Sequence, residues 1–211
     1  MRERLFTAVV GDILDELGLL HQFLPESVHP LHDDMVILGR AMPVLEADLH
    51  GCQAATKPFG LMLEALDDLK QNEVYVATAS SEARYAMWGE LMSTRARHLG
   101  AAGAVLNGPT RDTRGILAMN FPVFSTGRYA QDQRARGQVV DFRIPLNIEQ
   151  VRIEPGDVIF GDIDGVLVIP RAAEREALTR ALEKVAKENT VRSAILNGMS
   201  AAGAFAKHGV M

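Results

Sequence analysis

The feature of this sequence that most restricts its fold is a dense series of strand-like segments between residues 121 and 169. Short apolar runs alternate there with Gly, Pro and Asp, which is typical of strands joined by tight turns. The runs are 121–124, 139–144, 151–153, 158–160 and 166–169. The pattern predicts a β-rich centre that lacks the regular alternation of strand and helix found in a doubly wound fold.

Segments with other periodicities surround this β-rich centre. Apolar residues three and four positions apart from Val9 to Leu17 predict an amphipathic helix that ends at Gly18. The sequence further predicts helices at 61–69 and 89–98, one or two strands at 35–49, strands at 73–78 and 104–106, and three helices after Pro170, around 178–185, 191–195 and 200–207. We therefore expect a mixed α/β fold that forms a single domain over residues 1–211 and ends with C-terminal helices.

Composition and charge exclude several classes of protein. The chain has 211 residues, of which 47% are hydrophobic, so it can bury one core but is too short for two ordinary domains and a linker. Its formal net charge of -5 argues against a nucleic-acid surface or an anionic membrane, and no apolar run approaches the ~20 residues of a bilayer span. Cys52 is the only cysteine, so neither an internal disulfide nor a cysteine metal cage can form. We expect a cytoplasmic protein with no nucleic-acid or membrane partner.

Two motifs resemble known catalytic loops but lack the residues that would complete them. The segment from Gly161 to Gly165 resembles the aspartate loop of haloacid-dehalogenase-type phosphatases, yet only 46 residues follow it and none of them is Asp. We interpret this segment as a tight acidic turn between two strands, in which Gly165 supplies an unusual backbone conformation. Residues 103–108 have the span of a phosphate-binding loop, but Pro109 stands where that loop requires Lys. The six histidines form no HxxxH pair.

A stronger candidate site lies where a predicted helix begins. Gly89 precedes Glu90, Leu91 and Met92, which form the first turn of that helix. A helix N-terminus presents unpaired amide donors and a partial positive charge, so the backbone of these three residues can hold a substrate carboxylate, with Gly89 permitting close approach. The predicted substrate-binding residues are therefore Gly89, Glu90, Leu91 and Met92.

The catalytic half of the candidate site is the pair Arg111-Asp112, which follows the predicted strand at 104–106. Arg111 carries a permanent positive charge on a planar donor fork, which suits a keto or enolate oxygen of the substrate. Asp112 is a hard oxygen ligand for Mg²⁺, an ion that keeps most of its waters. Because no lysine in this segment offers a Schiff base, the residues predict metal-dependent retro-aldol cleavage or β-decarboxylation of a 2-oxo acid. An Arg-Asp pair alone is more often a surface ion pair, so the assignment depends on its surroundings.

Those surroundings resemble the RraA-like family, which includes class II pyruvate aldolases that act on 4-hydroxy-4-methyl-2-oxoglutarate. In that family a glycine and an acidic residue open the helix, here Gly89 and Glu90, and an Asn-Gly-x-x-Arg-Asp loop follows, here residues 107–112. The similarity continues through 120–124 and 155–170, and it covers nearly the whole chain.

The resemblance implies a swivelling ββα-type fold, a homotrimer or a dimer of trimers, and an active site at the subunit boundary. It implies that Asp112 binds Mg²⁺ or Mn²⁺, that Arg111 contacts the oxo oxygen of the substrate, and that the backbone of residues 90–92 receives its carboxylate. The expected activity is that of a lyase that cleaves 4-hydroxy-2-oxo acids to pyruvate, with oxaloacetate decarboxylation as a second reaction. The alternative is a non-catalytic RraA-type regulator that binds a ribonuclease. A third label used in this family, menaquinone methyltransferase, gains no support, because the sequence contains no loop for a methyl donor.

The sequence departs from the family pattern at two positions. Glu90 stands where the family usually has Asp, which keeps the charge but changes its reach. Gly115 stands where the aldolases tend to carry an acidic residue, three positions after Asp112, so the role of that carboxylate is left to another residue. Glu188, on a predicted C-terminal helix that could reach a neighbouring subunit, is one candidate.

Overall fold

One long central strand, β2 (Ile37–Asp48), sets the architecture of the chain. The computed structural model describes residues 5–49, 58–80 and 83–209, so Cys52 lies outside the described residues. Along one edge, β2 pairs in parallel with β3 (Glu73–Ala79). Along its other edge it pairs antiparallel with β9 (Val158–Asp162) and β6 (Gly137–Phe142). One strand therefore joins the two halves of the main sheet.

The half of the sheet on the β3 side alternates strand and helix. After β2 the chain forms α2 (Met62–Asp67), β3, α3 (Glu90–His98), β4 (Gly103–Asn107), α4 (Thr113–Ala118) and β5 (Val123–Ser125). The strands β2, β3, β4 and β5 lie parallel in that order. The alternation of helices at 61–69 and 89–98 with strands at 73–78 and 104–106 was predicted, and the predicted lack of alternation in the β-rich centre holds beyond β5. The sequence did not reveal α4, because Ile116 is the one buried residue of its six, so it shows no apolar period such as the three buried residues of α2 give.

The other half of the sheet lies in the predicted β-rich centre, and its strands pair antiparallel. β9 forms a hairpin with β10 (Gly165–Ile169), while β7 (Leu146–Ile148) and β8 (Val151–Ile153) form a separate two-stranded sheet. The acidic segment before Gly165 is the turn of the first hairpin, and Gly165 has φ 141°, which confirms the structural interpretation of this motif. Asp162 accepts hydrogen bonds from the backbone N–H (2.8 Å) and the hydroxyl (2.7 Å) of Thr7, and so fastens α1 (Thr7–Glu16) to the sheet.

The two edges of the sheet approach each other through the segment 22–30. Its first part pairs with β10, where Leu24 N–H donates to Val166 O (2.9 Å) and Val168 N–H donates to Gln22 O (2.9 Å). Its last part, β1 (His29–Pro30), pairs antiparallel with β5 at the opposite edge. Both edge strands thus have backbone groups covered by the same segment, and the sheet is nearly closed into a barrel.

Helices cover the sheet and form two cores. One core packs α2, α3 and α4 against β2 to β5, and it includes the fully buried Val76, Leu106 and Phe124. The other packs α1 and the beginning of α5 (Glu174–Leu196) against β9 and β10, around Leu14 and Leu167. The expected mixed α/β fold with C-terminal helices is confirmed. Within the described parts of the chain, no helix has the length and apolar character of a membrane span.

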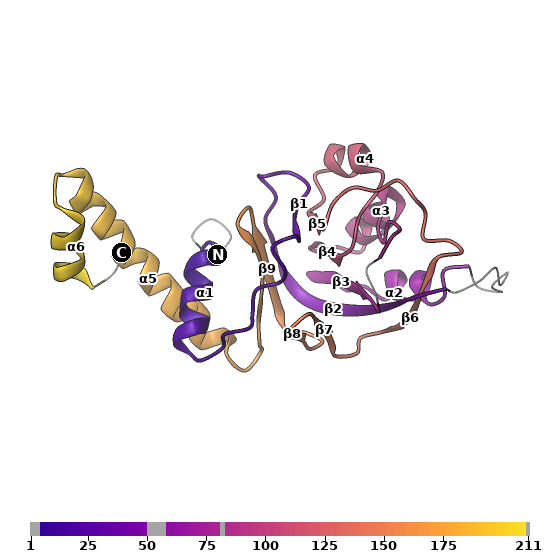
Figure 1. Cartoon of the computed structure of the whole chain (residues 1–211), viewed down its shortest axis with the longest axis horizontal. Helices are drawn as coiled ribbons and strands as arrows, with labels where there is room; N and C mark the ends of the chain where they lie inside the picture. The colour runs from indigo at the N-terminus through magenta and orange to yellow at the C-terminus, as the bar shows by residue number, and fades with distance from the viewer. Residues whose placement is uncertain (1–4, 50–57, 81–82, 210–211) are drawn as a thin grey trace.

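The C-terminal helices form an arm. Figure 1 shows α5 leading away from the sheet, with α6 (Ala201–His208) folded back at its far end. α5 is one continuous helix of 23 residues, so the prediction of separate helices around 178–185 and 191–195 is wrong. The residues between those segments include neither Gly nor Pro, and nothing there interrupts the helix. α6 begins where predicted, capped by Ser200, whose hydroxyl accepts a hydrogen bond from Gly203 N–H (3.1 Å).

β2 also carries a buried carboxyl group, that of Glu46, which has no exposure to solvent. Its Oε2 accepts a hydrogen bond from Nε2 of Gln133 (2.8 Å), whereas its Oε1 has no hydrogen-bond partner in the described structure. Burial, and to a smaller extent the negative charge of Asp48, raise the pKa of Glu46 to about 8. At neutral pH the folded protein therefore holds Glu46 mainly in its protonated form.

We predict that Glu46 makes the protein less stable as the pH rises. Its folded-state pKa of about 8 lies above the ordinary value of 4.5, so the folded state keeps a proton that the unfolded state releases between these values. Glu46→Gln removes this titration. The free energy of unfolding of the variant should match that of the wild type below pH 4.5 and exceed it above pH 8, by on the order of 5 kcal/mol.

Urea unfolding across this pH range measures the difference, and the exposed Glu26→Gln serves as the control. A wild-type protein and a Glu46→Gln variant with the same pH dependence would show that Glu46 is not held protonated by the fold.

Candidate active site

Three chain segments meet beside the carboxyl ends of β4 and β5. The segment 108–112 follows β4, the segment 126–130 follows β5, and the segment 86–89 leads into α3. The first two meet because neighbouring parallel strands end at the same edge of a sheet. Backbone bridges join all three segments into an irregular ladder.

Thr110 is the centre of this ladder and is fully buried. Its N–H donates to Gly127 O (3.0 Å), and its hydroxyl donates to Trp88 O (3.1 Å). The N–H of Arg111 also donates to Trp88 O (3.0 Å). The backbone from which Arg111 and Asp112 project is therefore held on both sides.

Gly89 is the N-cap of α3, and the space around it explains why it is glycine. Its backbone is extended (φ -161°), a conformation open to any residue, but a Cβ at this position would lie 2.7 Å from Oδ2 of Asp112. The N–H of Glu90 donates to the same oxygen (3.3 Å). The close approach expected at Gly89 is thus made by Asp112. In the described structure, the N–H groups of Leu91 and Met92 are first-turn donors that have no acceptor.

Asp112 has a left-handed backbone conformation (φ 56°) at the start of α4. Aspartate tolerates this region better than most residues, at a cost of about 1 kcal/mol. Its carboxylate is half exposed, and its Oδ2 lies 3.8 Å from Nε of Arg111. The Nη1 of Arg111 lies 3.2 Å from Oδ1 of Asp132. The two residues predicted to be catalytic are therefore neighbours in space, and the guanidinium lies between two acids.

A pocket of about 390 Å³ opens at this pair. Its lining residues are Thr110, Arg111, Asp112, Thr113, Arg128, Tyr129 and Ala130. Residues 90–92 are not among them and adjoin the pocket through the Glu90 bond to Asp112.

Arg128 and Tyr129 were not predicted, although a position directly after a parallel strand is a signal for this edge of the sheet. Nη2 of Arg128 donates to Leu31 O (3.1 Å). The residues that line the pocket carry two guanidinium groups and one carboxylate, and this balance favours an anionic ligand.

Glu90 and Gly115 are sterically coupled. A Cβ at position 115 would overlap the carboxyl group of Glu90. The Glu90 side chain therefore occupies the space beside the first turn of α4 that a side chain at position 115 would fill. The two departures seen in the sequence are thus complementary, because the longer acid at position 90 brings a carboxylate to a place where position 115 has no side chain.

Asp112 is the carboxylate among the residues lining this pocket that a cation could use, while Glu90 contacts Asp112 through its backbone N–H. Among the described residues, no group of three or more His, Cys, Asp or Glu could hold a metal ion. Such a site does not fit an ion that needs a full protein cage, such as structural zinc. It fits Mg²⁺, and Mn²⁺ in a similar way, because this ion can take one or two carboxylates, keep several waters and share substrate oxygens.

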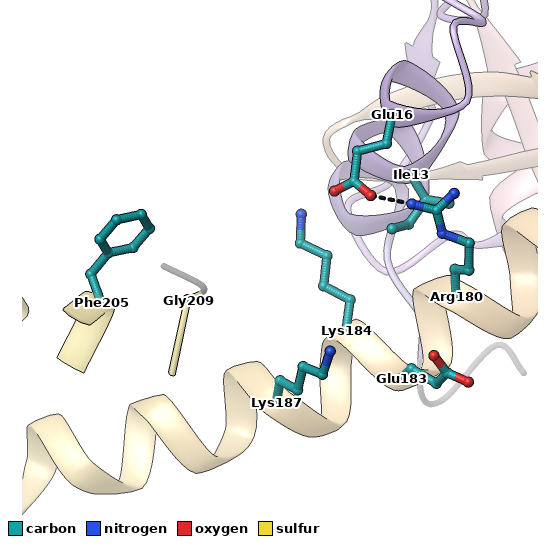
Figure 2. A pocket seen from close by; sticks show the side chains of 8 residues that line it. All are labelled: Ile13, Glu16, Arg180, Glu183, Lys184, Lys187, Phe205 and Gly209. Carbon is teal, nitrogen blue, oxygen red and sulfur yellow. Dashed lines mark hydrogen bonds and ion pairs between the residues drawn. The ribbon is translucent and has the colours of Figure 1, made fainter. Parts of the chain in front are cut away.

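A second hollow, of about 330 Å³, lies between α1, α5 and the end of α6 (Figure 2). Its lining residues are Ile13, Glu16, Arg180, Glu183, Lys184, Lys187, Phe205 and Gly209. Arg180 forms an ion pair with Glu16, and Lys184 forms one with Asp12 of α1 (2.6 Å). These cations already face acids of α1, so we interpret the hollow as part of the contact between α1 and α5.

Known proteins resemble this chain in sequence and in structure. Residues 7–168 match the model of the RraA-like family, described as Aldolase/RraA. A protein of Halalkalibacterium halodurans named "Putative 4-hydroxy-4-methyl-2-oxoglutarate aldolase" is 31% identical over 199 residues, which cover 94% of this chain and 89% of that protein.

Two solved structures share the fold over most of their length. One, described among "novel cellulases from microbes associated with the gut ecosystem", has a TM-score of 0.83 at 32% identity, over 89% of this chain and 83% of the other. The other is RraAS2 of Streptomyces coelicolor, described as an unusual member of the RNase ES inhibitor RraA protein family. It has a TM-score of 0.79 at 22% identity, over 90% of this chain and 92% of the other, and this likeness shows the fold alone.

We predict that the effect of Gly115→Ala depends on Glu90. An alanine inside a helix usually stabilises it by about 1 kcal/mol relative to glycine. In the wild type the new Cβ must displace the Glu90 carboxyl group, so the gain should be reduced or absent. In a Glu90→Ala background the full gain should return, which a double-mutant cycle of urea unfolding measures. Equal gains in both backgrounds would show that Glu90 does not occupy this space.

Proposed function

Because this chain belongs to the RraA-like family, we propose that it is a divalent-metal-dependent lyase that cleaves 4-hydroxy-2-oxo acids and releases pyruvate. The name of the Halalkalibacterium relative supports an aldolase in general. The observation that carries the finer proposal is the pairing of Arg111 with the half-exposed carboxylate of Asp112 at one pocket. The expected substrates are of the 4-hydroxy-4-methyl-2-oxoglutarate type. Oxaloacetate decarboxylation is a second expected reaction, since it forms the same enolate.

Each group has one task in this proposal. The N–H groups of Leu91 and Met92 would bind the substrate carboxylate. Asp112 would hold Mg²⁺ or Mn²⁺, which supplies Lewis-acid polarisation of the 2-oxo group when bound. As the bond between C3 and C4 breaks, negative charge develops on the C2 oxygen, and the Arg111 guanidinium stabilises it from a fixed position.

The charge of the pocket also bears on the description of one structural neighbour as a cellulase. Hydrolysis of a glycosidic bond usually takes two carboxylic side chains on opposite sides of the sugar. Asp112 is the one acidic residue among those that line this pocket, beside Arg111 and Arg128. An anionic oxo acid therefore suits the pocket better than a neutral polysaccharide does.

We predict that Asp112→Asn and Arg111→Lys each lower pyruvate release by about 100-fold. Asparagine tolerates the left-handed backbone at position 112 and can still accept the Glu90 N–H, so the first variant removes the charge with little other change. Lysine keeps the charge at position 111 but loses the planar fork. A lactate dehydrogenase-coupled assay, run with Mg²⁺ and with a chelator, measures the rates.

The exposed Asp15→Asn and Arg175→Lys are matched controls for these variants. Unchanged rates in the two site variants would reject the assigned roles. If the wild type releases no pyruvate but binds a ribonuclease in a pull-down, and binding survives Asp112→Asn, then the non-catalytic regulator is the correct alternative.

We further propose that the arm, defined as residues 182–208, is covered by a neighbouring subunit of a homotrimer. Within one subunit the arm buries only Val191 and Ala204, while Leu196 and Phe205 are 81% and 57% exposed. Helices with so little buried surface are marginal in water. Glu188 lies on α5, the helix that leads away from the sheet (Figure 1), and in this proposal it serves a neighbour's pocket as the base for the substrate 4-hydroxyl.

We predict that Glu188→Gln keeps the oligomer but lowers pyruvate release by about 100-fold, since the base is lost. Phe205→Asp should dissociate the oligomer, because it places a charge on the exposed apolar face of the arm. Size-exclusion chromatography with light scattering gives the mass, and the coupled assay gives the rate. Glu183→Gln, also on α5, is the control. A wild-type monomer with full activity would contradict the shared site.

A further inference from the structure

Asp132 is an acidic residue beside the pocket that has no task in the proposed reaction. Its Oδ1 lies 3.2 Å from Nη1 of Arg111, both side chains are 38% exposed, and Asp132 does not line the pocket. An ion pair with this exposure contributes little to the stability of a fold. At this distance it can instead restrict the orientation of the Arg111 guanidinium.

The backbone around Asp132 belongs to the same ladder as the site. Asp132 forms a parallel bridge with Ala86, and Ala86 N–H donates to Gln131 O (2.8 Å). Ala86 begins the segment 86–89, whose Trp88 carbonyl accepts the N–H of Arg111. The ion pair therefore connects two parts of one hydrogen-bonded framework. Each of its two partners lies on a segment that this framework holds in place.

A buried contact holds the Asp132 segment from the side of the core. The next residue, Gln133, is buried and donates from Nε2 to Oε2 of Glu46 (2.8 Å). The carbonyl of Gln133 also accepts from Gly137 N–H (3.0 Å), at the first residue of β6. Because Glu46 lies on β2, this bond fixes the segment to the central strand of the sheet.

We propose that Asp132 is a positioning residue for Arg111 and that the buried Glu46–Gln133 hydrogen bond sets the place of Asp132. The inference rests on the proposed function, in which Arg111 binds the oxo oxygen. With Asp112 engaged by a cation, Asp132 is the acidic partner left to Arg111 in the described structure. By holding Nη1 it restricts rotation of the guanidinium plane and leaves the other N–H groups to the ligand, so less conformational freedom is lost on binding.

The test uses oxalate, a planar dianion similar in shape to the enolate of pyruvate, as the probe in the presence of Mg²⁺. Isothermal titration calorimetry should show about tenfold weaker binding to Asp132→Asn, with an unchanged melting temperature. Asp132→Glu keeps the charge and should restore part of the affinity. In an Arg111→Ala background, Asp132→Asn should have no further effect, because its action passes through Arg111. The exposed Asp141→Asn is the matched control.

The buried anchor is tested by two further variants. Glu46→Gln keeps an acceptor for Gln133 and should bind oxalate as the wild type does. Gln133→Met has a similar length but no N–H donor, and it should weaken binding in the same direction as Asp132→Asn, again only when Arg111 is present. If Gln133→Met does not fold, the comparison of Asp132→Asn in the two Arg111 backgrounds still decides the positioning role.

The outcomes separate this inference from the proposed function. If Asp132→Asn binds oxalate like the wild type, or weakens binding equally without Arg111, the positioning role is wrong even if the wild type releases pyruvate. If oxalate binding depends on Asp132 through Arg111 but no pyruvate is released from any substrate, the positioning role stands and the proposed reaction is wrong. A wild type that neither binds oxalate nor releases pyruvate overturns both.

Discussion

The pairing of β2 on both of its edges is the constraint on which the rest of the structure depends. Its residues 40–46 pair in parallel with β3, while 37–40 and 44–48 pair antiparallel with β9 and β6. Parallel neighbours require crossover connections, here with short helices, whereas antiparallel neighbours can be joined by hairpins. The parallel strands β4 and β5 end at one edge of the sheet, so the loops that follow them meet there, and this meeting creates the candidate site.

The site combines a fixed backbone with exposed charges. Thr110 is buried and bonded on both sides, yet the next two residues carry a guanidinium and a carboxylate that are 38% and 47% exposed. Asp112 keeps a left-handed conformation that costs free energy, and Gly89 leaves room for its carboxylate. A site built this way loses little conformational freedom when a ligand binds. This property is required of a site that stabilises charge developing in a transition state.

Two acidic residues lie next to Arg111, and a third holds the segment that carries one of them. Asp112 lies at the pocket, Asp132 lies beside it, and Glu46 lies behind Gln133 in the core. Burial of a carboxyl group such as Glu46 is costly unless it is protonated, and the raised pKa of Glu46 agrees with this. A buried group that costs stability but fixes a segment of the candidate site fits selection for geometry at the expense of stability.

The sequence by itself determined the mixed α/β class and most strands and helices, and it identified Arg111-Asp112 as the candidate pair. Apolar periodicity is a local property, and the helix start and the Arg-Asp loop lie within 24 residues of each other, so short-range patterns were enough to find them. Only the tertiary structure decided which other residues lie beside this helix start and this loop. Arg128, Asp132 and the Glu46–Gln133 bond, whose partners are 87 positions apart, are brought to the site by strand pairing and burial, which no local pattern records. The continuity of α5 and the fit between Glu90 and Gly115 were decided in the same way, because they depend on what surrounds a residue in space.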